Sequence, residues 1–145
     1  MKKRVFLASL AVSFLSVGLS AAQAQAPVAA PAGAEAYIIA PADGAKVKNP
    51  VVVQFGLKGM GIAPAGIQMD NTGHHHLFVD TPLPTDMTKP IPAVDGKVIH
   101  FGKGQTETTL TLSPGKHTLQ LLLGDYLHIP NAKPVESKQI TITVE

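Results

Sequence analysis

Apolar residues recur at every second position in several short stretches after residue 35, and turn-forming residues separate these stretches. The clearest runs place apolar side chains at Val51, Val53, Phe55 and Leu57, at Leu119, Leu121 and Leu123, and at Ile140, Ile142 and Val144. A period of two is the spacing of side chains on one face of a β-strand. No stretch shows convincing helical periodicity, and glycine and proline are frequent, so the pattern predicts an all-β fold.

Seven strands are expected, at Ala36–Ile39, Pro50–Lys58, His74–Asp80, Lys97–Phe101, Gln105–Leu112, Lys116–Leu123 and Ser137–Val144. Gly102-Lys103-Gly104 is predicted to form a tight hairpin connection between the fourth and fifth of them. Seven such strands over about 110 residues are typical of an immunoglobulin-like antiparallel β-sandwich. A small closed or jelly-roll-like barrel is the alternative.

The first 24 residues have the three parts of a secretory signal peptide: a basic start at Lys2, Lys3 and Arg4, an apolar run over Val5–Leu19, and the small-residue motif Ala22-Gln23-Ala24. A membrane anchor is the alternative, but the apolar run is shorter than the about 20 residues that span a bilayer. We therefore expect a signal peptide over 1–24, an Ala/Pro-rich spacer over 25–34 and one domain over 35–145. Export to the periplasm or secretion from a bacterium follows from this division.

Removal of the signal peptide changes the net charge. The full chain has 12 Lys and Arg against 10 Asp and Glu, and the first 24 residues hold three of the basic residues and none of the acidic ones. The exported protein therefore keeps nine basic and ten acidic residues. This balance argues against nucleic acid or a membrane surface as a partner. Cysteine is absent, so neither disulfides nor thiolate ligands are available.

Three consecutive histidines, His74-His75-His76, begin one of the predicted strands. Because side chains alternate along a strand, His74 and His76 share one face, and His75 faces the core with Leu77 and Val79. Two imidazoles at i and i+2 can bind one metal ion. In an alternating sandwich, the connections 59–73, 102–104 and 124–136 share one end of the molecule, which is where this strand begins.

Further candidate ligands are predicted at the same end of the sandwich. His100 lies near the end of its strand, His128 lies in the connection 124–136, and Met60 and Met69 lie in the connection 59–73. We therefore predict a metal site formed by His74, His76, His100, His128 and Met60, with Met69 as an alternative thioether. His117 falls at the opposite end and is predicted to be structural, as a polar ring that bonds back to the preceding turn.

Histidine and methionine without cysteine form a ligand set suited to copper, with zinc as the alternative. The predicted function is thus that of a small exported protein that binds copper or another transition metal. The alternative is an interaction or adhesion module for an envelope component, in which the histidines only order the loops. An enzymatic role is not expected, because Ser113 has no base at a known spacing and no established metalloenzyme motif is present.

Long stretches of the sequence resemble a family of exported bacterial proteins known as a domain of unknown function. These stretches are Asn71-Thr72-Gly73-His74-His75-His76-Leu77, Ile99-His100-Phe101-Gly102, Gly104-Gln105-Thr106-Glu107-Thr108-Thr109-Leu110 and Pro114 to Asp125. The resemblance extends from about Tyr37 to Val144. It implies a periplasmic or secreted location and brings no established activity or cofactor. The family often has a second histidine where this chain has Asn131, in His128-Ile129-Pro130-Asn131.

Overall fold

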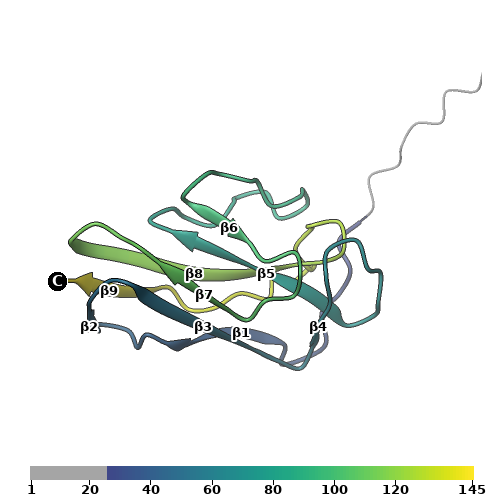
Figure 1. Ribbon diagram of the computed structural model, residues 1–145. Helices are drawn as coiled ribbons and strands as arrows, with labels where there is room; N and C mark the ends of the chain where they lie inside the picture. Colours follow the sequence, from purple (N-terminus) through teal and green to yellow (C-terminus); the bar gives the residue numbers. More distant parts are fainter. Residues whose placement is uncertain (1–25) are drawn as a thin grey trace, which may run out of the picture.

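The computed structural model describes residues 26–145, and within this range it contains strands and no helix (Figure 1). The predicted signal peptide over 1–24 lies outside the described residues. The strands are β1 (Glu35–Ala40), β2 (Lys46–Val47), β3 (Val51–Lys58), β4 (Gly61–Ile62), β5 (Thr72–Val79), β6 (Val98–His100), β7 (Glu107–Leu110), β8 (Gly115–Gly124) and β9 (Ile140–Val144).

The strands form two open sheets. The smaller sheet has the order β1-β3-β7, and the larger has the order β2-β9-β8-β5-β4, with β6 also paired to β5. Within residues 26–145 neither sheet closes on itself, so the predicted all-β sandwich is confirmed and the alternative of a closed barrel is not. The immunoglobulin-like assignment stays a prediction.

Each of the seven predicted strands overlaps a strand of the structure, but two features differ from expectation. The two-residue strands β2 and β4 were not predicted, and they pair in parallel with β9 and β5, so the pairing is not wholly antiparallel. The predicted hairpin at 102–104 is wrong, because β6 pairs with β5 whereas β7 pairs with β3 in the other sheet. Gly102-Lys103-Gly104 is therefore part of a crossing from one sheet to the other.

The main hydrophobic core lies between the two sheets. The smaller sheet contributes Val53 and Phe55 from β3, and the larger contributes Leu77 from β5 and Leu121 from β8, all of them buried. These residues occupy the alternating positions that the sequence pattern predicts for inward faces.

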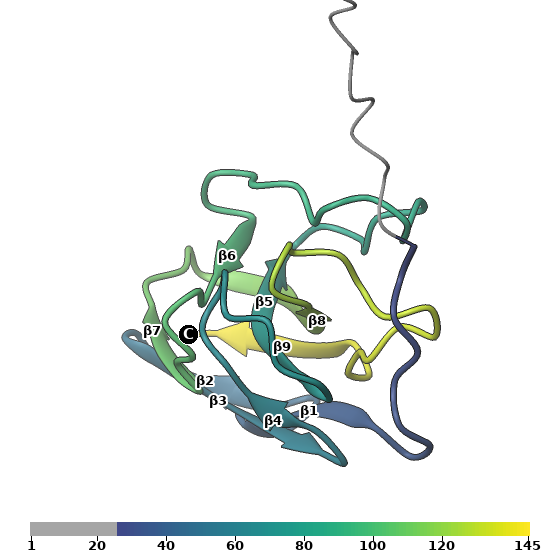
Figure 2. The same ribbon diagram turned by 90° about the vertical axis from the view of Figure 1, so that its right-hand side faces the viewer.

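The central strand β5 is buried on both faces. Leu77 and Val79 face the main core, whereas Phe78 packs on the outer side of the larger sheet with Ile91, Val98 and Leu122. The connection between β5 and β6 lies on this outer side, away from β1 and β3, in both Figure 1 and Figure 2. The outer side of β5 therefore supports a second, smaller core.

Residues 26–34, most of the predicted spacer, form no strand, but they are attached to the domain. The carbonyl oxygen of Val28 accepts hydrogen bonds from the backbone N–H of Ala132 at 2.9 Å and from Asn131 Nδ2 at 3.2 Å. Ala30 and Ala34 pack against the main core. This segment therefore borders the β8–β9 connection, which also contains His128.

Candidate metal centre

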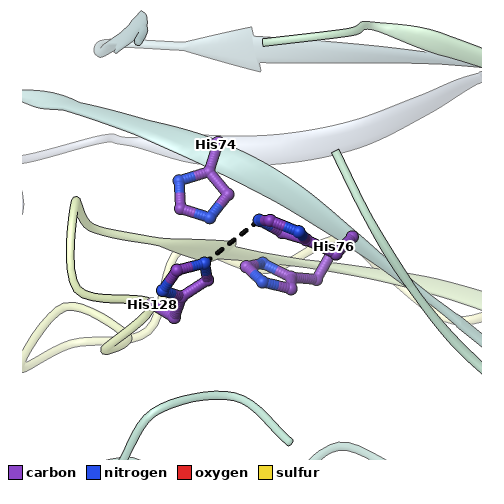
Figure 3. A group of neighbouring side chains, drawn as sticks. His74, His76 and His128 are labelled. Carbon is purple, nitrogen blue, oxygen red and sulfur yellow. Dashed lines mark hydrogen bonds between the residues drawn. The ribbon is translucent and has the colours of Figure 1, made fainter. Parts of the chain in front are cut away.

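Four histidine rings from three parts of the chain meet on the outer side of the larger sheet. His74 and His76 come from β5, His100 ends β6, and His128 lies in the connection between β8 and β9. One ring nitrogen from each lies within 4.8 Å of the corresponding nitrogen of the other three. Figure 3 shows the rings of His74, His76 and His128 gathered around a common point. We call these four residues the histidine cluster.

Strand register brings three of the four rings together. The i, i+2 spacing places His74 and His76 on one face of β5, with ring centroids 4.9 Å apart. His100 lies directly opposite His76 in the antiparallel pair of β5 and β6, and their rings stack at 5.0 Å. Cross-strand neighbours on one face are close enough for their side chains to interact, so the contact follows from the pairing itself.

The fourth ring is positioned by a tight turn. His128 has a φ of 68°, and its N–H donates to the Asp125 carbonyl oxygen at 2.9 Å. The Asp125 carboxylate accepts hydrogen bonds from the N–H groups of Leu127 at 2.8 Å and Ile129 at 2.9 Å, which fixes the turn. The His128 carbonyl oxygen in turn accepts from the Ile91 N–H at 2.8 Å, so the β5–β6 connection is tied to this turn.

Two glycines leave room for the rings. A Cβ atom at Gly102 would lie 2.7 Å from His100 Nε2, and one at Gly124 would lie 2.9 Å from His76 Cε1 and 3.2 Å from the His128 Cα. Real Cβ atoms essentially never make contacts under 3.0 Å, so a side chain at Gly102 or Gly124 would displace a ring of the cluster. Neither glycine has a positive φ, and their role here is steric.

Burial keeps the inner rings uncharged. His74 is 0% exposed and His76 is 2% exposed. Burial, followed by the neighbouring rings of the cluster, lowers the pKa of His74 to about 4 and that of His76 to about 3. Burial and the neighbouring His128 also lower the pKa of His100. Neutral imidazole is the form that binds metal, so these rings need to release no proton at neutral pH.

The inner rings carry nitrogen atoms without a protein partner. Among the described residues, both ring nitrogens of His74 and Nδ1 of His76 are buried and make no hydrogen bond. A buried polar group left unpaired costs about 1–3 kcal/mol. The Nε2 atoms of His100 and His128 face each other at 3.1 Å, which requires one of them to donate and the other to accept.

A metal ion suits this arrangement because it would bind one nitrogen of each ring, and so give a partner to one of the two unpaired nitrogens of His74. With metal–nitrogen bonds of about 2.0 Å, tetrahedral ligands lie roughly 3.3 Å apart, close to the 3.1 Å between His100 and His128. The donor set consists of imidazoles only. Such a set suits copper, zinc and nickel rather than magnesium or calcium, which prefer oxygen ligands.

The structure places the sequence-predicted residues as follows. It brings His74, His76, His100 and His128 together. These four residues lie near the end of the larger sheet where β5 begins. They lie on the outer face of that sheet, and not among the loops at the end of the sandwich, where the sequence predicted them. It does not place Met60 with them. Met60 lies in the bend between β3 and β4 and packs against the main core, and together with the exposed Met69 it lines a separate cavity.

The two remaining histidines have other surroundings. His75 faces the main core as predicted, with its ring in an edge contact with Phe55 at 5.3 Å. His117 Nδ1 lies 2.6 Å from the Asp80 carboxylate, and its Nε2 lies 2.8 Å from the Ser113 carbonyl oxygen. His117 thus bonds back to the preceding turn, as predicted. Both partners are acceptors, and the hydrogen bonds to Asp80 and Ser113 raise the pKa of His117.

Sequence reasoning missed the residues that shape the cluster: Ile91, Gly102, Gly124 and Asp125. The glycines read as ordinary turn residues, and Asp125 reads as a solvated loop carboxylate. Their roles depend on which strands are neighbours, which the sequence does not state. The one local signal for a turn at His128 was Asp125, three residues earlier, because an Asp at this spacing is typical of a turn stabilised by its side chain.

The fold and the site together thus define the class of protein: an all-β sandwich with a four-histidine cluster on one face of a sheet. The chain belongs to the family described as a domain of unknown function, DUF4399, whose profile matches residues 53–145 and so includes the whole cluster. No curated protein and no solved structure matches the chain. Residues 26–145 contain no helix long and apolar enough to cross a membrane.

Proposed function

We propose that this protein is an exported bacterial metal-binding protein that holds one transition metal ion through His74, His76, His100 and His128. The observation that carries the proposal is the convergence of four imidazole rings, of which the two inner ones have buried, unpaired nitrogens. Export rests on the predicted signal peptide over 1–24.

Copper is the proposed ion, and zinc is the alternative. Among the divalent first-row metals, nitrogen donors bind Cu(II) most tightly, and they bind Zn(II) with lower affinity. A thioether ligand would add affinity for Cu(I), but Met60 packs against the main core and so gives that oxidation state no support. Four imidazoles alone suit Cu(II) and Zn(II).

The proposal includes no catalysis. Ser113, His117 and Asp80 lie in the order of a hydrolase triad, with Ser113 Oγ 3.5 Å from His117 Nε2. However, Nε2 donates to the Ser113 carbonyl oxygen at 2.8 Å, and the raised pKa favours the protonated ring. A ring in this state cannot accept the proton of a serine hydroxyl, so the group supports a structural role.

Calorimetric titration of the purified, metal-free protein with Cu(II) and Zn(II) tests the proposal. We expect one equivalent to bind at neutral pH. His100→Ala should weaken binding by at least about 100-fold, because loss of mere outer-shell partners already costs 10–100-fold. His100 is exposed, so the variant should fold, and Lys103→Ala, at a nearby exposed position, is the matched control. Absence of binding at micromolar metal, or equal affinity in the two variants, contradicts the proposal.

One observation favours the alternative of an interaction module for an envelope component. Tyr37 and Ile39 of β1 and Val52 of β3 are exposed on the outer face of the smaller sheet, at 42%, 57% and 50%. Exposed apolar side chains that share a sheet face are typical of contact surfaces. Wild-type protein that binds no metal, together with loss of envelope association in Ile39→Ser, would favour this function over the first.

A further inference from the structure

The four rings of the histidine cluster are unequally accessible. His74 and His76 are buried on β5, the central strand of the larger sheet, whereas His100 is exposed and His128 is half-buried. His100 ends a three-residue strand whose partner among the strands of residues 26–145 is β5. A metal ion held by all four would therefore have two fixed inner ligands and two ligands near the surface.

A cavity of about 110 Å³ adjoins the surface ligands. It is lined by three members of the cluster, His76, His100 and His128, and by the apolar residues Ile91, Pro92, Ala93 and Val98. Pro92, Ala93 and His100 are exposed, so the cavity reaches the surface. It has room for several water molecules, and therefore for one small donor group.

The wall of this cavity is held in place. Ile91 is buried in the outer core with Phe78 and Val98, and its N–H donates to the His128 carbonyl oxygen at 2.8 Å. Val98 N–H donates to the Val94 carbonyl oxygen at 2.8 Å, which closes the turn before β6. The opening beside the cluster is thus a built feature of the β5–β6 connection.

From these observations we propose that this cavity is the route by which the metal ion enters and leaves the cluster, and that exchange occurs by attack of an external donor group through it. The inference rests on the proposed function and specifies the partner: a molecule or protein side chain that presents one nitrogen, sulfur or oxygen donor at the His100 side.

The exchange step is a ligand substitution. The incoming donor forms a bond to the ion through the cavity, and the bond from the ion to the His100 ring breaks, with the nitrogen lone pair returning to the ring. The oxidation state of the ion does not change, and the step needs no electron or proton carrier. His74 and His76 hold the ion until further donors replace them. This order follows from burial, because His74 and His76 are the buried ligands and His100 is the exposed one.

Stopped-flow transfer of Zn(II) from the loaded protein to a chromophoric chelator tests the route. We expect a wild-type rate proportional to chelator concentration. In Ala93→Phe, the rate constants for Zn(II) uptake and release should both fall about fivefold or more, with their ratio, the dissociation constant, unchanged within about twofold. Ala132→Phe is the matched control, since Ala132 is exposed and does not line this cavity.

Three results would overturn the route while leaving metal binding intact. These are a transfer rate independent of chelator concentration, equal rates in Ala93→Phe and Ala132→Phe, and a changed dissociation constant without slower exchange. Failure of the wild-type protein to take up Zn(II) or Cu(II) would instead remove the proposed function itself, so the two failures are distinguishable.

Discussion

His75 lies between two proposed ligands but faces the opposite side of β5. It is 0% exposed, and neither ring nitrogen has a hydrogen-bond partner among the described residues. Its surroundings are apolar, with Phe55 at 5.3 Å. A polar ring in such a place costs free energy, whereas an apolar side chain of similar size would not.

His75→Leu is therefore expected to stabilise the metal-free protein by about 1 kcal/mol in free energy of unfolding, because it removes an unpaired buried polar group. Thermal and denaturant unfolding measure the change. Metal affinity should stay at the wild-type value, since the ring points away from the cluster. A loss of more than about 1 kcal/mol would mean that His75 makes a stabilising hydrogen bond.

His117 makes the free energy of unfolding depend on pH, and the direction of its pKa shift sets the sign of this dependence. Its pKa in the folded protein is raised above the ordinary value of 6.5 by the hydrogen bonds to Asp80 and Ser113. The stabilisation is therefore fully present below pH 6.5 and is lost as the pH rises through the folded-state pKa. The window therefore begins at the ordinary value of 6.5 and ends at the raised folded-state pKa of His117, whereas the pKa values of His74 and His76 are lowered, to about 4 and about 3.

We expect His117→Gln to lower the melting temperature clearly at about pH 6 and much less at an alkaline pH above the folded-state pKa, where the wild-type ring is neutral. Differential scanning calorimetry at the two pH values measures the difference. An equal loss at both, or a larger loss at the alkaline pH, would show that the charged form of His117 is not the stabilising one.

At the scale of elements, the cluster depends on close approach between β5, β6 and the β8–β9 turn. Gly102 follows β6 and lies under the ring of His100, so an added methyl group would push that ring out of the cluster. Gly61 in β4 offers a comparison, since a Cβ there would meet only Thr72 Cγ2 at the ordinary distance of 3.4 Å. Neither residue has a positive φ, so alanine introduces no backbone strain at either.

Gly102→Ala is expected to weaken Cu(II) or Zn(II) binding by about 10–100-fold, the usual effect of disturbing the groups that orient a metal ligand. Gly61→Ala should bind as the wild type does. Isothermal titration, with circular dichroism to check that both variants fold, provides the measurement. Similar affinities for the two variants would indicate that the His100 ring needs no support from Gly102.

At the scale of the whole molecule, alternation in the sequence predicted the long strands well. The inward positions of β3, β8 and β9 are those that carry Val53, Leu121 and Ile142, all buried in the main core. The period of two also gave the opposite orientations of His74 and His75. These features are local to one strand, which is why the sequence alone could supply them.

Features that depend on strand partnership were harder to predict. The sequence does not state that β6 pairs with β5 and β7 with β3, so the connection at 102–104 resembled a hairpin. The same pairing moves the histidine cluster from the loop end to the outer face of the larger sheet. Met60 was assigned to the cluster by its loop, but in the structure the bend before β4 places it against the main core.

The central claim is that four histidines, and not six, bind one metal ion. The most direct test follows the ring signals of all six histidines by NMR during titration of the metal-free protein with Zn(II) at neutral pH. The structure predicts that the signals of His74, His76, His100 and His128 shift together and saturate at one equivalent, while those of His75 and His117 change little. Unchanged signals from these four rings at micromolar Zn(II), or shifts confined to His75 or His117, would contradict the claim.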